Sequence, residues 1–157
     1  RTQLRLTHRS PKLEHYAAPV MGLLHKLLQQ EHSANLREQT LEATQSLGLR
    51  LSKLLNEADR QNWQDQEVIG PIFSPACYIE HSVPSVLYLL AKYKTDAEQA
   101  LIANTEAGGD NCHRGAILGG LLGAAGGTSV FPSRWIEQLH DRTTILEEIE
   151  HFIESVH

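Results

Sequence analysis

The segment from residue 107 to residue 127 constrains the fold most, because its glycines recur at the spacing of a helix turn. Gly115, Gly119, Gly123 and Gly127 follow one another at four-residue steps. Each glycine inside a helix costs about 0.5 to 1 kcal/mol relative to alanine. The pattern therefore predicts a helix whose glycine stripe packs closely against another backbone.

This helix is predicted to begin at about Asp110. Gly108 and Gly109 free the backbone just before it, and aspartate is a favoured N-cap residue. The polar residues 110–113 then lie at a helix N-terminus, where unpaired N–H groups and the helix dipole favour anions. The sequence therefore predicts a ligand site at this turn.

Helical spacing of apolar residues continues along most of the chain, and no alternating run long enough for a strand interrupts it. Ser10 is an expected N-cap, and Thr95 with Glu98 forms a capping-box pattern. These patterns predict an all-α, multi-helix orthogonal bundle with helices over residues 11–30, 35–58, 84–93, 95–107, 110–126, 132–139 and 145–156.

The helical period lapses between about Gln61 and His81, where Gly70-Pro71 and Ser74-Pro75 occur. A structured connector is expected there. Its apolar residues either plug the core or line a ligand cleft, since long ordered loops in compact domains are often functional. These residues are Trp63, Val68, Ile69 and Phe73.

Composition excludes several classes of protein. A formal net charge of −5 without a basic cluster argues against nucleic-acid binding, and no uncharged apolar run is long enough to span a membrane. The two cysteines form no CxxC pattern and the nine histidines form no HExxH pattern. A cytoplasmic protein is expected.

Several short segments of the sequence together are typical of one protein family. They are Gly-Gly-Asp at 108–110, the glycine-spaced run at 115–127, Phe-Pro-Ser-Arg-Trp at 131–135, Leu-Thr-His-Arg-Ser-Pro at 6–11 and Ala-Leu-Ile-Ala-Asn-Thr at 100–105. This pattern resembles the C-terminal part of the ADP-ribosylglycohydrolase family, which includes crystallin J1. The resemblance implies an all-helical domain over residues 1–157 that is the C-terminal half of a longer unit, completed by a missing N-terminal half or chain.

The resemblance also implies a magnesium site, with a departure. Magnesium-binding members carry Asp-Thr-Asp followed by Thr or Ser after the glycines. Asp110 matches the first carboxylate and is the predicted metal ligand, whereas Cys112 and His113 occupy the second carboxylate and hydroxyl positions. Thiol and imidazole suit Mg²⁺ poorly, because this ion prefers oxygen ligands.

Three functional classes follow from these residues. The first is a hydrolase of ribosyl linkages, acting on an ADP-ribosylated protein or a related nucleotide sugar. The second is an inactive module that binds ADP-ribose or a nucleotide. The third is an enzyme that uses Cys112 as nucleophile, because a helix N-terminus favours the thiolate. The expected catalytic residues are Asp110 and Cys112.

Substrate contacts are expected from residues around the same turn. Arg114 lies four residues after Asp110, so it is predicted either to pair with that carboxylate or to meet a phosphate. A base for Cys112 is expected from elsewhere, with His8 and His81 as candidates. The predicted substrate-binding residues are Gly108, Gly109, Asn111, His113 and Arg114.

Overall fold

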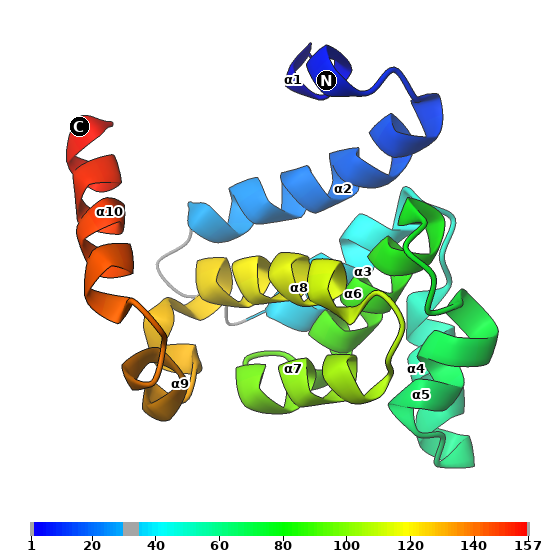
Figure 1. Ribbon diagram of the computed structural model, residues 1–157. Coiled ribbons are helices and arrows are strands. Elements are labelled where there is room, and N and C mark those ends of the chain that lie inside the picture. The colour runs from blue at the N-terminus through cyan, green and yellow to red at the C-terminus, as the bar shows by residue number, and fades with distance from the viewer. Residues whose placement is uncertain (1, 30–34, 157) are drawn as a thin grey trace.

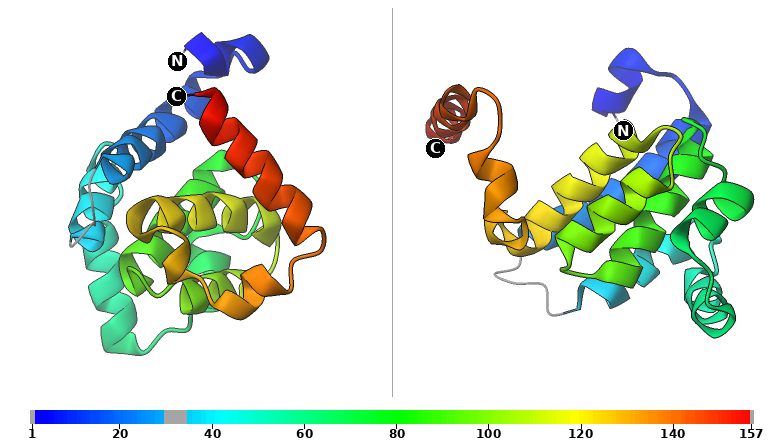
Figure 2. Two further views of the ribbon diagram at one scale, coloured as in Figure 1. Left: turned by 90° about the vertical axis from the view of Figure 1, so that its left-hand side faces the viewer. Right: turned by 60° about the horizontal axis from the view of Figure 1, so that its bottom comes forward.

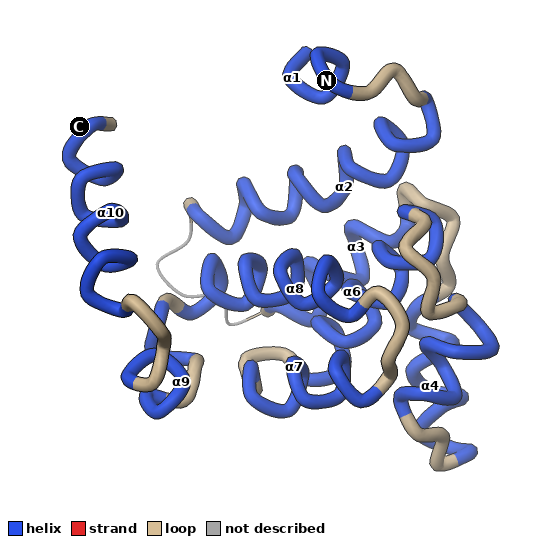
Figure 3. Tube along the Cα trace, viewed as in Figure 1, coloured by secondary structure: helices blue, strands red, loops and turns tan. Residues whose placement is uncertain are grey.

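The computed structural model describes residues 2–29 and 35–156, and these contain helices and loops but no strand (Figures 1 and 3). The predicted all-α fold is confirmed. The elements are α1 (Thr2–Thr7), α2 (Pro11–Leu28), α3 (Leu36–Gln45), α4 (Leu51–Gln61), α5 (Asp65–Glu67), the π-helix η1 (Val68–Phe73), α6 (Ile79–Tyr93), α7 (Ala97–Glu106), α8 (Asn111–Gly126), the 3-10 helix η2 (Thr128–Val130), α9 (Ser133–Glu137) and α10 (Arg142–Ser155).

Helix α6 forms the centre of the core. Its residues from Ser82 to Ala91 are buried, and it packs against α2, α3, α7 and α8. Helix α8 also contacts α2 and α7, and Figure 2 shows these helices running side by side. The N-terminus of α8 is therefore held on a rigid base of packed helices.

The expected C-terminal amphipathic helix is present as α10, but it stands apart from α2 and α8 (Figure 1). All of its residues are exposed, including Ile149, which is 49% exposed, and Phe152, which is 67% exposed. Its apolar side is therefore not buried against the rest of the chain. None of the helices described combines the length and the apolar character needed to cross a bilayer.

The prediction of a single helix over residues 35–58 is wrong. Two helices, α3 and α4, occupy this region, and Gly48 lies between them with a φ of +68°. A left-handed residue ends a helix, and glycine adopts that conformation without a steric penalty. The predicted end of the first long helix, Gln30, lies outside the described residues; α2 ends at Leu28.

Two predicted helix starts are also shifted. Helix α6 begins at Ile79, so Pro84 lies inside it, buried, rather than at its first turn. Burial among the core helices offsets the hydrogen bond that proline cannot donate. Helix α7 is capped by Asp96 and not by Thr95, because the Asp96 carboxylate accepts a hydrogen bond from the Gln99 N–H at 3.1 Å.

The connector over residues 61–81 contains more helix than expected, namely α5, η1 and the first turn of α6. The interpretation that its apolar residues plug the core is confirmed for Val68 and Ile69, which are fully buried. Trp63 and Phe73 line an opening, and their part in a ligand cleft stays a prediction. The buried Asp65 carboxylate accepts hydrogen bonds from three side chains of α6, at 2.5 to 2.9 Å. These donors are Tyr88, Lys92 and Tyr93.

The glycine stripe of α8 packs closely at only some positions. A Cβ on Gly115 would lie 3.1 Å from Asn104 Nδ2, and one on Gly123 would lie 3.5 Å from the Phe131 ring. Among the described residues, a Cβ on Gly119 would meet no atom within 4 Å outside the backbone of its own helix, and Gly127 lies beyond the helix with a φ of +72°. The predicted continuous packing stripe is therefore wrong in its middle.

Candidate functional site

The turn before α8 requires glycine at both of its positions. Gly108 and Gly109 have φ values of +66° and +62°, which side-chain-bearing residues rarely adopt. A Cβ on Gly109 would also collide with the Pro75 carbonyl. The Asp110 N–H donates a hydrogen bond to this carbonyl at 3.0 Å. The connector thereby fixes the point at which α8 begins, at the predicted N-cap Asp110.

Arg114 lies beneath this turn with no exposed surface. Its guanidinium donates to the carbonyls of Gly108 at 2.5 Å and Pro75 at 3.2 Å, and to Asn104 Oδ1 at 3.1 Å and the Asn104 carbonyl at 3.4 Å. Burial lowers the pKa of Arg114, and the charge of Asp110 opposes this shift. The Arg114 guanidinium, which was expected to bind a phosphate or the Asp110 carboxylate, instead stabilises the turn through these hydrogen bonds.

Asn104 is a site residue that the sequence reasoning did not single out. It is buried, and its Nδ2 donates to the Asn111 carbonyl at 2.9 Å while its Oδ1 accepts from Arg114. One amide thus connects the end of α7 with the first turn of α8. The available signal was its place in the Ala-Leu-Ile-Ala-Asn-Thr segment just before the glycines.

Asp110 and His113 form the polar pair of the turn, with His113 exposed and Asp110 half-buried. His113 Nδ1 lies 2.6 Å from Asp110 Oδ1, and the side chains are 82% and 18% exposed, respectively. The Asp110 carboxylate makes no hydrogen bond as a helix cap. When Nδ1 carries the ring proton and donates it to Asp110, the other ring nitrogen, Nε2, is an acceptor.

Cys112 and Asn111 share the first turn of α8 but contact each other rather than the pair. The Cys112 thiol is exposed, and its Sγ lies 3.5 Å from Asn111 Oδ1. The two histidines considered as its base have other neighbours: His8 Nδ1 lies 3.0 Å from the Thr7 hydroxyl, and the His81 ring packs edge-on against Tyr78. The described contacts therefore pair Asp110 with His113, and they show no base at Cys112.

The donors at the turn do not fit a pair of magnesium ions. Among residues 2–29 and 35–156, no three His, Cys, Asp or Glu side chains gather closely enough to hold a metal. Asp110 is the carboxylate of the turn, and one of its oxygens is engaged by His113. Mg²⁺ takes octahedral oxygen coordination, which one carboxylate, a thiol and an imidazole do not supply.

Comparison with known proteins assigns the chain to one family. A family model described as ADP-ribosylglycohydrolase matches residues 1–157, the full length of the chain. Neither the curated proteins nor the solved structures gave a match. The matched residues include the glycine turn, Arg114 and Asn104 beneath it, and the Asp110–His113 pair. The chain therefore belongs to the ADP-ribosylglycohydrolase family, whose domain supports a glycohydrolase-like function.

Proposed function

We propose that this chain supplies the α8 turn of a site that hydrolyses a ribosyl linkage in an ADP-ribosylated protein or a related nucleotide sugar. The observation that carries the proposal is the Asp110–His113 pair at the N-terminus of α8, in which the exposed His113 ring contacts the half-buried Asp110 carboxylate. Family membership supports a glycohydrolase-like reaction. The pair adds residues suited to one step of it.

In this reaction a water oxygen bonds to the anomeric carbon and the bond from that carbon to the leaving group breaks. The leaving group takes a proton from the solvent, which regains one when His113 releases the proton that it took from the attacking water. His113 Nε2 accepts the proton from water while Asp110 fixes the ring through Nδ1. The Asp110 carboxylate also stabilises positive charge on the developing oxocarbenium-like centre. Asn111 and the glycine backbone lie beside this pair and are proposed to contact the substrate.

Magnesium is not assigned a step in this mechanism, because the donor set at the turn does not fit the two-ion arrangement. Asp110 remains the one residue proposed as a metal ligand. A titration of Mg²⁺ followed by the amide resonances of residues 110–113 tests this assignment. Shifts that saturate and are absent in Asp110→Asn would support it, and an unchanged spectrum would remove it.

A module that binds ADP-ribose without turnover is the second candidate. The single carboxylate at the turn favours it, since glycoside hydrolysis commonly uses two. The proposed cysteine enzyme has weaker support, because the described contacts of Cys112 include Asn111 but no base. Cys112→Ser distinguishes this class, since loss of the thiol would abolish its turnover and leave the other two classes unaffected.

We also propose that a further helical chain or segment packs against α2 and α8, as the family resemblance implies. A groove of about 370 Å³ lies between α2, α6 and α8, and its lining is apolar. Met21 is 59% exposed and Ile117 is 37% exposed there. Co-expression with the N-terminal half of a family member tests this. Ile117→Glu should prevent co-purification, while Leu28→Glu, at an exposed position outside the groove, should not.

The main test is an assay for ADP-ribose release from ADP-ribosyl-arginine and ADP-ribosyl-serine, with and without magnesium. Removing a general base costs about 10²- to 10⁴-fold in rate, so Asp110→Asn and His113→Gln are each expected to lose at least a hundredfold. Binding of ADP-ribose without release would select the second candidate. If Asp110→Asn left both binding and release unchanged, the site assignment would be wrong.

A further inference from the structure

A second opening lies between α4 and η1, formed by residues that the proposed hydrolase site does not use. It has a volume of about 470 Å³, within the usual range of small-molecule pockets of about 300 to 1,000 Å³. Side chains that line it include Leu49, Arg50, Lys53, Leu54, Trp63 and Phe73. We call this opening the α4 cleft.

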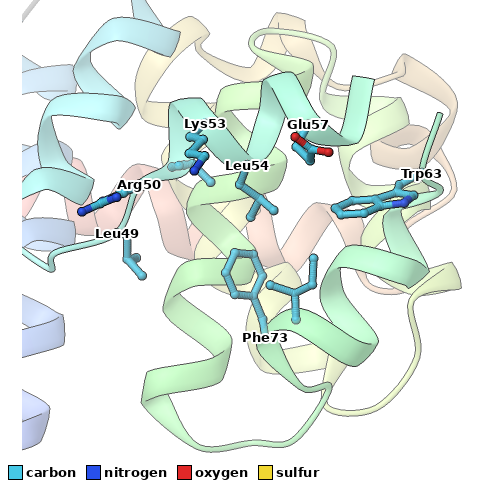
Figure 4. A pocket seen from close by; sticks show the side chains of 9 residues that line it. Leu49, Arg50, Lys53, Leu54, Glu57, Trp63 and Phe73 are labelled. Carbon is cyan, nitrogen blue, oxygen red and sulfur yellow. The ribbon is translucent and has the colours of Figure 1, made fainter. Parts of the chain in front are cut away.

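The α4 cleft is lined mainly by apolar side chains, and cationic side chains lie toward one end. Figure 4 shows Trp63 at one end and Leu49 with Arg50 at the other, with Leu54 and Phe73 between them. In the same view Lys53 lies on α4 between Arg50 and Leu54 (Figure 4). A ligand that lies along the cleft therefore meets aromatic and aliphatic groups, with the Glu57 carboxylate on α4 between Leu54 and Trp63, and cations toward the Arg50 end.

The cations at the cleft differ in their surroundings, because the charge of Lys53 acts on Glu57 and contributes to the lowered pKa of that carboxyl. Glu57 is paired with Arg60, and it also accepts a hydrogen bond from Gln61 Nε2 at 3.2 Å. The hydrogen bond from Arg60 lowers the pKa of Glu57 and keeps this carboxyl ionised. Over residues 2–29 and 35–156, neither Arg50 nor Lys53 has a side-chain hydrogen bond or ion pair. An anionic group at Arg50 and Lys53 would therefore displace no described hydrogen bond, and the nearby Glu57 carboxylate is paired with Arg60.

The backbone around the cleft fixes the relative positions of its two ends. Gly48, with a φ of +68°, precedes α4, and Asn62, with a φ of +52°, ends it. The opposite wall is the π-helix η1, which carries Phe73. Single turns of π-helix are uncommon and frequently accompany functional sites. The cleft is therefore built from ordered backbone on both sides.

We propose that the α4 cleft binds a monocarboxylate with an apolar body, its carboxylate at Arg50 and Lys53 and its body along Leu54 and Phe73 toward Trp63. Arginine pairs with carboxylates through two parallel hydrogen bonds, and lysine adds a point charge. An apolar body covers the aromatic side chains and removes their surface from water. This proposal does not rest on the hydrolase function, because the two sites share no residue.

The test uses decanoate as the probe and Trp63 fluorescence as the signal. The chain has two tryptophans, so Trp135→Phe leaves Trp63 as the single reporter. Decanoate is expected to change the Trp63 emission saturably. The double variant Arg50→Glu with Lys53→Glu should weaken binding at least tenfold, and Arg142→Glu, on the exposed helix α10, should change it less than twofold.

Neutral and cationic probes of equal chain length complete the test on the unaltered cleft. 1-Decanol and decylammonium should each bind at least tenfold more weakly than decanoate. If either binds as tightly, the cations do not select the ligand and the proposal is wrong. Equal decanoate binding by the double charge variant and the Arg142→Glu control would overturn it as well, with circular dichroism checking that both variants are folded.

Discussion

Replacing Arg114 by methionine is predicted to destabilise the fold strongly. Methionine retains the apolar stem but removes the guanidinium, which makes four hydrogen bonds beneath the glycine turn. Three backbone carbonyls and Asn104 Oδ1 would then lose a donor in the interior. The turn that positions Asp110 would lose its support at the same time.

The magnitude follows from these contacts. A buried acceptor left without a donor costs about 1 to 3 kcal/mol. Two of the four bonds are long, at 3.2 and 3.4 Å, and methionine avoids the cost of burying a charge. We therefore expect a loss of about 3 to 5 kcal/mol in the free energy of unfolding, a large part of the about 5 to 15 kcal/mol typical of a domain.

Urea denaturation followed by circular dichroism measures this loss. The matched control is Arg134→Met, because Arg134 is an exposed arginine paired with Glu98, and exposed ion pairs contribute about 0 to 1 kcal/mol. Arg114→Lys should fall between the two, since lysine keeps the charge but not the fork. Equal losses for Arg114→Met and Arg134→Met would refute the assignment of Arg114 as the support of the turn.

Three further predictions concern the turn and the Asp65 cluster. Gly109→Ala should lower the melting temperature more than Gly108→Ala, because both require a left-handed residue but a Cβ only at Gly109 meets another backbone; equal melting temperatures would contradict this. Asp65→Asn should cost about 2 to 3 kcal/mol in urea denaturation, since the buried carboxylate accepts three hydrogen bonds, and a loss below about 0.5 kcal/mol would count against it. Burial raises the pKa values of Tyr88 and Tyr93 above their ordinary value of 10.0. The folded state thus keeps protons that the unfolded state loses, so the stability that these tyrosines contribute is fully present below about pH 10 and falls as the pH rises further. Tyr88→Phe should reduce the slope of the free energy of unfolding against pH in urea titrations, and an equal slope would argue against this.

Much of the helical architecture could be predicted because local signals and packing agree. Gly108, Gly109 and Asp110 place the start of α8 correctly, since a positive φ followed by a capping residue is a local property. The break at Gly48 was missed because an apolar stripe continued through it, and one glycine inside a periodic run does not reveal its φ. Pro84 was misplaced because burial overrides a local breaker.

The candidate site was predictable in position but not in its internal roles. Sequence spacing places Asp110 and His113 within one helix turn, and the structure joins them. The sequence spacing does not show that the Arg114 side chain turns inward, because its hydrogen-bond acceptors include the carbonyl of Pro75, which is far away in the chain. The cluster around Asp65 was hidden for the same reason, since its donors come from α6.

The shared use of the Pro75 carbonyl makes this family member sensitive to chain length as well as to residue identity. One oxygen accepts from both the Asp110 N–H and the Arg114 guanidinium, and any residue at position 75 has such an oxygen. Inserting or deleting one residue between η1 and α6 would move that oxygen by up to about 3.5 Å, beyond hydrogen-bond reach of both donors. Homologues that keep this turn are therefore expected to keep the length of the η1–α6 connection while its side chains vary.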